Sequence, residues 1–159
     1  MTTAQPILEI RDARREDLPA ILALVAQDSM SHPGEAGAVT DAHYRAFEEI
    51  AAHPDHRLIV GTLAGEALEG EVVATLQLSY LPGLGFGGAW RAQLEAVRVR
   101  SDLRSRGIGA HIVSWAIDEA RRRGCNLVQL TSNQARMNAR RFYERLGFKA
   151  SHIGMKLYL

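Results

Sequence analysis

The sequence has a single cysteine, Cys125, among its 159 residues. One thiol excludes a disulfide within the chain and any metal cluster built on cysteines. Cys125 follows Gly124 at the start of an apolar run, so we expect a small buried side chain. The six histidines are scattered, and the close pair His53 and His56 has no further paired ligand beside it, so we expect no metal site.

Long apolar stretches are also missing, since no run approaches the roughly 20 residues that span a bilayer. Residues 1–6 lack the charged-then-apolar layout of a signal peptide. No internal repeat, low-complexity tract or linker interrupts the chain, so we expect residues 1–159 to form one domain. These absences together predict a cytoplasmic protein with no membrane partner.

The net charge is only +1, but the charges are unevenly distributed. Residues 1–90 carry five arginines against thirteen acids, whereas residues 91–149 carry twelve arginines and one lysine against five acids. A basic half suits a polyphosphate ligand or a nucleic acid, because either is held by neutralising its phosphates. An ordinary solvated helix face would give the same excess, and the triplet Arg121 to Arg123 fits the positively charged end of a helix.

Hydrophobic periodicity predicts alternating strands and helices, the pattern of an α/β protein with a mixed sheet. Strands are expected at residues 7–13, 58–63, 71–80, 93–100, 127–131 and 148–157. Helices are expected at 17–27, 40–52, 108–123 and 135–146, with a glycine-rich loop at 81–89. Alternation in the fourth strand puts Leu94, Ala96 and Arg98 on one face and Glu95, Val97 and Val99 on the other.

The stretch from Arg104 to Gly109 (RSRGIG) opens the long helix predicted at 108–123. Backbone N–H groups at a helix start have no partner within the helix, and the helix dipole makes them positive. Gly107 and Gly109 would let phosphate oxygens approach the backbone, and the two arginines add charged donors. The stretch therefore suits a pyrophosphate. It lacks the Gly-Lys-Ser/Thr ending of a nucleoside triphosphatase loop and the third glycine of a dinucleotide fingerprint.

A second motif follows after one predicted strand, where residues 138–148 read NARRFYERLGF. The two motifs together resemble those of the GCN5-related N-acetyltransferase (GNAT) superfamily. Its Arg/Gln-x-x-Gly-x-Gly/Ala phosphate motif is matched by Arg104, Gly107 and Gly109. Its Ala-x-x-Phe/Leu-Tyr-x-x-x-Gly-Phe helix is matched by Ala139, Phe142, Tyr143, Gly147 and Phe148. The order of elements agrees over nearly the whole chain.

This resemblance implies a mostly antiparallel sheet that splays between its fourth and fifth strands, flanked by about four helices. Acetyl-CoA would lie in the gap, with its pantetheine arm paired along the strand at Val97, Arg98 and Val99. Its pyrophosphate would lie against Arg104, Ser105, Arg106, Gly107, Ile108, Gly109 and Ala110.

Further contacts implied by the resemblance are Asn133, Asn138 and Arg140. Asn133 has the alternative role of a turn or helix cap, and Arg140 that of a solvated side chain. Arg136 departs from the family's pattern, because many members have asparagine seven residues before the tyrosine.

The resemblance also implies direct acetyl transfer to a primary amine, without a covalent enzyme intermediate. Tyr143 is the candidate acid for the leaving thiolate, because a phenol is protonated at neutral pH. Glu95, near the splay and partly desolvated, is the candidate base, directly or through water, and the Val97 N–H is a candidate oxyanion donor. The alternatives are a core tyrosine for Tyr143 and, for Glu95, an exposed glutamate or an ion-pair partner of Arg98 or Arg100.

The run LVQLTSN…RFYERLGF…SHIGMKL is similar to small-molecule acetyltransferases, including those acting on aminoalkylphosphonates. We therefore expect a small-molecule amine as acceptor and no nucleic-acid partner. The family often pairs terminal strands, which makes residues 151–159 a candidate homodimer edge. Two alternatives stay open: a non-catalytic acyl-CoA-binding module of the same fold, and a small RNA-binding domain that uses the basic half.

Overall fold

The computed structural model describes residues 7–27, 38–65 and 68–159. The strands are β1 (Ile7–Asp12), β2 (His56–Ala64), β3 (Val72–Leu81), β4 (Trp90–Val99) and β5 (Cys125–Leu130). The helices are α1 (Leu18–Ala26), α2 (Asp41–Ala52), α3 (Gly85–Gly88), α4 (Ile108–Arg122) and α5 (Met137–Arg145), with 3-10 turns at Arg15–Asp17 and Ser101–Leu103. Through α5 these elements confirm the predicted order, with α3 as a short helical turn inside the predicted loop.

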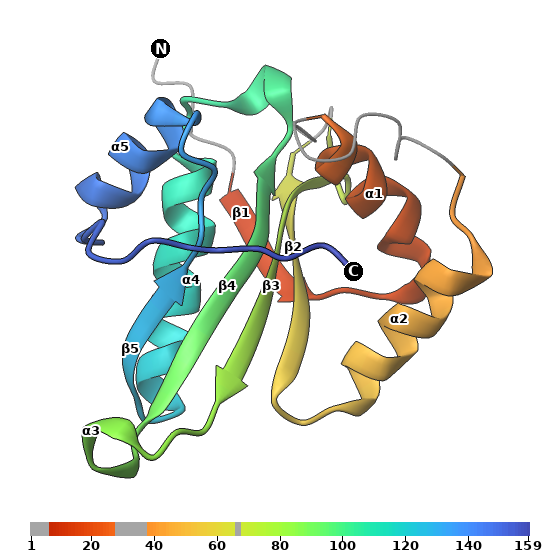
Figure 1. Cartoon of the computed structure of the whole chain (residues 1–159). Helices are drawn as coiled ribbons and strands as arrows, with labels where there is room; N and C mark the ends of the chain where they lie inside the picture. The colour runs from red at the N-terminus through yellow and green to blue at the C-terminus, as the bar shows by residue number, and fades with distance from the viewer. Residues whose placement is uncertain (1–6, 28–37, 66–67) are drawn as a thin grey trace.

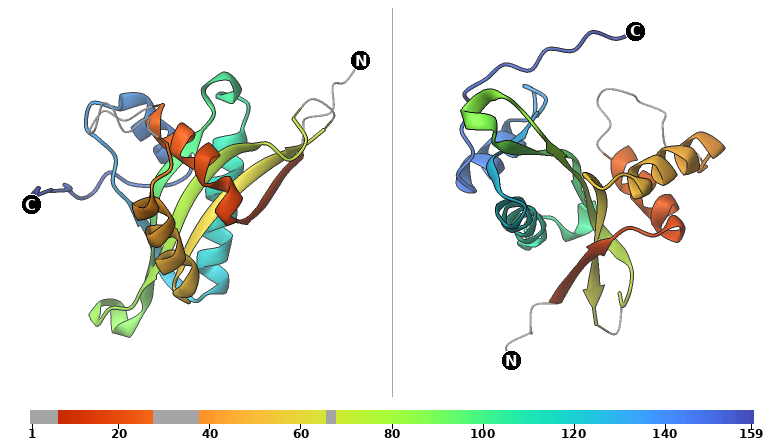
Figure 2. Two further views of the ribbon diagram at one scale, coloured as in Figure 1. Left: turned by 90° about the vertical axis from the view of Figure 1, so that its right-hand side faces the viewer. Right: turned by 90° about the horizontal axis from the view of Figure 1, so that it is seen from below.

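The strands form one sheet in the order β1-β2-β3-β4-β5 (Figure 1). Neighbours from β1 to β4 are antiparallel, whereas β4 and β5 are parallel. The parallel pair needs a long crossover, which α4 supplies. Helices α4 and α5 cover one face of the sheet, and α1 and α2 cover the other (Figure 2). The predicted mixed α/β sheet is therefore confirmed.

Local chemistry explains where the helices begin and end. Pro19 lies in the first turn of α1, where its missing N–H costs nothing. Before α2, the N–H and hydroxyl of Thr40 lie 3.1 and 2.9 Å from Nδ1 of His43, which ties the cap to the first turn. Gly124 follows α4 with a φ of 83°, a left-handed conformation that glycine adopts without strain.

The hydrophobic core lies between the sheet and α4. Leu76, Leu78 and Leu94 of the sheet are almost fully buried, together with Ile112 and Val113 of α4. Each such side chain stabilises the fold by roughly 1.5–3 kcal/mol. This core fixes α4, and therefore its N-terminus, against β3 and β4.

β4 departs from the predicted alternation at Ala96. The φ of Ala96 is 50°, which is unusual for a residue other than glycine. The register with β3 shifts at the same place, because Gln77 pairs with Glu95 whereas Thr75 pairs with Arg98. β4 therefore carries one residue more than β3 there, which is a β-bulge.

The bulge reverses the predicted faces beyond it. Paired residues on neighbouring strands point to the same side of a sheet, so Glu95 shares a face with Arg98. By the same rule Leu94 shares the opposite face with Val99. The predicted common face of Glu95, Val97 and Val99 is therefore wrong, because an extra residue shifts the two-residue period by one.

The strand predicted at residues 148–157 is also wrong. The Phe148 N–H bonds to the Tyr143 carbonyl at 3.1 Å and closes the end of α5. Residues 149–159 form neither helix nor strand and are exposed throughout. Their sequence has a strand-like pattern, but a strand also needs a partner elsewhere in the chain, and periodicity does not supply one.

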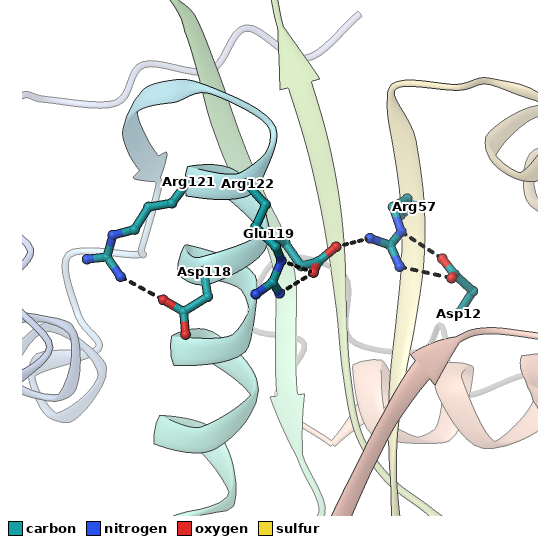
Figure 3. A network of polar contacts seen from close by, with 6 residues as sticks. All are labelled: Asp12, Arg57, Asp118, Glu119, Arg121 and Arg122. Atoms are coloured by element: carbon teal, nitrogen blue, oxygen red, sulfur yellow. Dashed lines mark hydrogen bonds and ion pairs between the residues drawn. The ribbon is translucent and has the colours of Figure 1, made fainter.

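A polar network joins the sheet to α4 (Figure 3). Arg57 of β2 donates from Nη1 to Glu119 Oε2 at 2.5 Å, and from Nε and Nη2 to the Asp12 carboxylate at 2.9 Å. The Arg57 guanidinium also lies 5.3 Å from the centre of the Trp115 ring. Hydrogen bonding to Arg57 is the main cause that lowers the pKa of Asp12.

The arginine triplet that ends α4 is engaged with acids. Arg121 pairs with Asp118, Arg122 with Glu119 and Arg123 with Asp55. The helix-end interpretation of this triplet is therefore confirmed. Both tryptophans pack against the core, and Arg123 lies 5.0 Å from the ring centre of Trp90.

Candidate functional site

The pairing between strands β4 and β5 stops partway along β4. Leu94 and Leu130 are their last partners, and β5 ends there while β4 continues to Val99. Residues 95–99 of β4 thus have no strand beside them on the β5 side within the described chain. The two strands open like a V toward the N-terminal end of α4, which is where the resemblance places the pantetheine arm.

Two carbonyls of this stretch already accept bonds from the chain's own arginines. The Val97 carbonyl accepts from Arg98 Nη1 at 2.9 Å, and the Val99 carbonyl accepts from Arg104 Nε at 3.3 Å. A carbonyl has two lone pairs, so a ligand N–H could bind beside or in place of a guanidinium. Arg98 and Arg104 therefore both lie where β4 and β5 diverge, and Arg104 also begins the predicted phosphate loop, residues 104–110.

The loop before α4 has the curled backbone that exposes amides. Ser105 and Gly107 have φ values of 62° and 81°, both in the left-handed region. The His111 N–H donates to the Gly107 carbonyl at 2.9 Å and begins the helix ladder. Amides that precede such a bond point out of the helix start and suit an anion. A Cβ at Gly107 would meet no atom within 4 Å, so close packing does not require a glycine here. The left-handed φ does, because glycine adopts it without strain.

Gly109 serves close packing. A Cβ at this residue would lie 3.3 Å from Cζ of Phe142 and 3.5 Å from Cγ2 of Val99. The glycine lets the first turn of α4 lie against both β4 and α5. The sequence suggested a different reason, the approach of phosphate oxygens, and did not reveal this one.

A hollow of about 350 Å³ lies between the phosphate loop and the start of α5. Arg104 lines one side, and residues 135–139, including Arg136 and Asn138, line the other. Two arginines and a helix N-terminus make the hollow favourable for negative charge. The structure thus brings predicted Arg104 and Asn138 together and adds Arg136. Sequence reasoning missed this role of Arg136, which stood only as a departure from the family's pattern.

Tyr143 is half-buried on α5 among aromatic rings. Its ring makes edge-to-face contacts with Phe142 and Phe148, at centroid distances of 5.0 and 5.7 Å. Burial raises the pKa of Tyr143, and the positive charges of Arg136 and Arg98 offset only part of that rise. The phenol is consequently protonated at neutral pH, and it lies within electrostatic reach of both the hollow and the splay.

Glu95 is exposed, whereas the sequence predicted a partly desolvated carboxylate. It is the first residue of β4 beyond the last pair with β5, so no neighbouring strand covers that side. Arg100, one suggested ion-pair partner, bonds instead to Glu71 and Asp102, each at 2.7 Å. The bulge leaves Glu95 next to the opening of the V.

Asn133 and Arg140 have partners within the chain. The Ala135 N–H donates to Asn133 Oδ1 at 2.9 Å, which is the turn role given as an alternative. Arg140 Nε donates to Glu144 at 2.9 Å on an exposed helix face. Their contacts with a ligand stay predictions.

A row of polar side chains crosses four strands beside Glu95, and sequence reasoning missed it. The register aligns His56 with Ser79, Ser79 with Gln93 and Gln93 with Gln129. His56 Nδ1 lies 2.8 Å from Ser79 Oγ, and Gln129 Nε2 donates to Gln93 Oε1 at 2.7 Å. Arg57 follows His56 in β2 and reaches Glu119 of α4, and successive residues of a strand point to opposite faces of the sheet. The polar row therefore faces the α1 and α2 side. The only signal in the sequence was the run of polar residues at alternate strand positions.

The described residues hold neither a cluster of metal ligands nor a membrane-spanning helix. No group of three or more histidine, cysteine, aspartate or glutamate side chains there could hold a metal ion. The rings of His53 and His56 lie 4.4 Å apart, Cys125 is half-buried and His32 lies outside the described residues. None of the helices in those residues is both long enough and apolar enough to cross a membrane.

Comparison with known proteins identifies the fold. A model of the acetyltransferase (GNAT) family matches residues 12–148. The aminoalkylphosphonate N-acetyltransferase of Salmonella typhimurium is 30% identical over 93% of this chain and 89% of its own length.

Two solved structures have closely similar folds. One, described as a transcriptional regulator from Bacillus halodurans, has a TM-score of 0.87 and 39% identity over 96% of this chain and 100% of that one. The glucosamine-6-phosphate N-acetyltransferase of Arabidopsis thaliana has a TM-score of 0.78 and 26% identity over 96% of this chain and 98% of its own.

Proposed function

Because the chain belongs to the GNAT family of acetyltransferases, we propose that it moves an acetyl group from acetyl-CoA to a primary amine of a small molecule. The observation that carries this proposal is the V between β4 and β5, which begins at Leu94 and Leu130 and opens toward the helix start at Gly107. The V can hold an extended arm, and the helix start can hold its phosphates. Both parts are needed for a donor of this shape.

The donor phosphates fit the hollow and the loop that borders it. Arg104 and Arg136 would meet their charge, and the amides from Ser105 to Ala110 would donate to their oxygens. The pantetheine arm would lie along Val97 to Val99. Further proposed contacts are Arg106, Asn133, Asn138 and Arg140. The hydrogen bond from Arg140 to Glu144 would first have to break.

The chemistry is assigned to two side chains. Glu95, exposed at the mouth of the V, would accept the ammonium proton through water, so that the amine nitrogen can attack the thioester carbon. As the carbon–sulfur bond breaks, the Tyr143 hydroxyl would give its proton to the departing thiolate, and the proton that the attacking nitrogen loses on becoming an amide would return to the Tyr143 oxygen. Proton transfer by positioned side chains of this kind accelerates reactions by about 10²–10⁴-fold. No nucleophilic side chain is needed, so the acetyl group passes directly to nitrogen.

The acceptor would lie on the side of the sheet that carries the polar row from His56 to Gln129. Hydrogen-bonding side chains suit a polar small molecule, and two relatives act on aminoalkylphosphonate and glucosamine 6-phosphate by their names. We propose that the acceptor is an amine that carries a phosphonate or phosphate group. We also propose that the protein acts as a homodimer in the cytoplasm. A non-catalytic acyl-CoA-binding module is the second candidate, since one close structural relative is described as a transcriptional regulator.

The test is an amine panel with acetyl-CoA, with free thiol and acetylated product measured in parallel. The panel contains aminoalkylphosphonates, glucosamine 6-phosphate, the same amines without the acidic group, and a lysine peptide. The proposal predicts amine-dependent thiol release with at least one acidic small amine. Tight acetyl-CoA binding without turnover on any amine would support the non-catalytic module instead.

A further inference from the structure

Arg91, near the start of β4, lies on the face of the sheet that carries the polar row. The register between β3 and β4 runs without a shift from Arg91 to Glu95. Arg91, Gln93 and Glu95 therefore point to the same face, because alternate residues of a strand do so. Trp90, the neighbour of Arg91, packs instead against the core on the α4 side. Arg91 thus shares the α1 and α2 side with Glu95, the proposed base.

Arg91 differs from other arginines of the chain that are covered to a similar degree. Arg11, Arg57 and Arg100 are partly buried, and each bonds to a carboxylate. Arg91 is partly buried too, yet it forms no ion pair with a carboxylate of the described residues. Removing a charge from water without a partner is costly. A guanidinium kept in this state is suited to an anion from outside the chain.

The surroundings of Arg91 position its side chain. Its neighbours across the sheet are Leu81 of β3 and Leu127 of β5, which can cover the apolar part of the side chain. A Cβ at Gly83 would lie only 3.0 Å from Nη1 of Arg91, so the glycine leaves room for the guanidinium. Gly83 follows the end of β3, so the guanidinium leans toward α3 and away from Glu95.

The proposed donor site and Arg91 lie at opposite ends of β4. Figure 1 shows α3 and the start of β4 at one end of the sheet, and the loop that leads into α4 at the other. The donor phosphates are proposed to lie at that loop, and Glu95 lies between the two ends. An acid group bound at Arg91 would therefore be far from the donor phosphates, and solvent would screen most of the repulsion between them.

The separation of Arg91 and Glu95 limits the shape of the acceptor. Four residues of extended strand span about 13 Å. Between them lies the polar row, whose uncharged side chains, including Gln93 and Gln129, can bond to hydroxyl groups. An acceptor that reaches both ends therefore needs a polar body between its amine and its acid group. A sugar ring supplies one, whereas the ethylene linker of 2-aminoethylphosphonate is too short.

We propose that Arg91 binds the acid group of the acceptor, and that the acceptor is an amino sugar phosphate whose amine and phosphate lie at opposite ends of the sugar. The phosphate accepts hydrogen bonds from the guanidinium, the sugar hydroxyls bond to the polar row, and the amine faces Glu95. This inference rests on the acetyl transfer proposed above and names the acceptor within it. Arg91 contacts no reacting atom, so it is a binding residue and takes no part in the chemical step.

The first experiment compares glucosamine 6-phosphate with glucosamine as acceptors. For each variant, the ratio of the two kcat/KM values measures the preference for the phosphate, and a general loss of activity cancels from this ratio. Wild type should prefer the phosphate. Arg91→Gln should lower the ratio by about 10–100-fold, because charged hydrogen bonds are lost. The loss should lie in KM for glucosamine 6-phosphate, with kcat little changed.

Two further variants separate a specific contact from general electrostatics. Arg91→Lys should keep part of the preference, because the charge stays while the paired donors of the guanidinium are lost. Arg45→Gln should keep the wild-type ratio, since Arg45 is exposed on α2, which covers the same face of the sheet. Circular dichroism checks that each variant is folded.

A second experiment tests the reach of the site with 2-aminoethylphosphonate and 6-aminohexylphosphonate. Wild type should use the longer acceptor with the higher kcat/KM, and Arg91→Gln should remove that difference. Higher kcat/KM with the shorter acceptor in wild type would overturn the inference.

The outcomes distinguish this inference from the proposed function. A wild type that acetylates glucosamine and its phosphate equally well would leave acetyl transfer standing and overturn the role of Arg91. An unchanged ratio in Arg91→Gln, or an equal fall in Arg45→Gln, would do the same. A wild type that acetylates no amine would overturn both.

Discussion

Nη1 of Arg57 in β2 lies 2.5 Å from Oε2 of Glu119 in α4. This ion pair joins the sheet to the helix that follows the phosphate loop. Their side chains are only 26% and 21% exposed, so solvent screens the pair less than it does an ordinary surface ion pair. The same guanidinium holds Asp12 of β1. One arginine thus connects three elements of the scaffold.

Replacing Arg57 should therefore destabilise the fold. We expect Arg57→Met to lower the free energy of unfolding by about 2 kcal/mol, because it removes charged hydrogen bonds from the partly covered Glu119 carboxylate and from the more exposed Asp12 carboxylate. Arg121→Met is the matched control, since Arg121 is 72% exposed and should cost only about 0–1 kcal/mol. Urea denaturation of both variants measures the difference, and equal losses would contradict the role of Arg57.

The effect of Arg57 should also depend on pH. Hydrogen bonding to Arg57 lowers the pKa of Asp12. Burial raises the pKa of Glu119, but the bonds from Arg122 and Arg57 outweigh it and the net pKa is lowered. A carboxylate with a lowered pKa in the folded state stabilises above its unfolded pKa and loses that contribution as the pH falls. The gap between wild type and Arg57→Met should thus be full at neutral pH and shrink below about pH 4. A gap that stays constant down to pH 2 would disagree.

Tyr143→Phe should abolish the acid role while keeping the aromatic packing. We expect kcat to fall by about 10²-fold or more, with acetyl-CoA affinity little changed. Because burial raises the pKa of Tyr143, any alkaline limb due to its ionisation should lie above about pH 10. Tyr44→Phe is the control, since Tyr44 lies on α2 against Arg15 and should keep wild-type kcat. Unchanged kcat in Tyr143→Phe would show that Tyr143 is a core tyrosine.

Glu95→Gln should slow the amine half of the reaction. We expect kcat/KM for the amine to fall most at pH values below the amine's pKa, where a proton must be removed, and much less at high pH. Glu69→Gln, an exposed residue in the turn between β2 and β3, should show no such pH-dependent loss. A pH profile of Glu95→Gln parallel to that of wild type would assign the base to another group.

The sequence predicted much of this architecture because most of its signals are local. Gly107 and Gly124 mark the two ends of α4, and alternation locates the strands that pair with their neighbours in sequence. The bulge at Ala96 could not be predicted, because nothing in residues 93–99 (QLEAVRV) marks an alanine that adopts a positive φ. Its consequence for the site is large, since it separates Glu95 from the face of Val99.

Other parts of the site depend on residues far apart in the chain. Arg136 lines the hollow only because α5 packs near the phosphate loop, and the 138–148 motif does not contain it. The polar row from His56 to Gln129 needs the register of four strands before it becomes one surface. Residues 149–159 have the periodicity of a strand but form none, because periodicity does not supply a partner strand.

The most direct test of the donor site is calorimetric titration of the purified protein with acetyl-CoA. The account predicts micromolar binding by wild type, at least tenfold weaker binding by the double variant Arg104→Gln/Arg136→Gln, and unchanged binding by Arg121→Gln. Circular dichroism confirms that each variant is folded. A well-folded wild type that does not bind acetyl-CoA, or a double variant that binds it as tightly as wild type, would contradict the account.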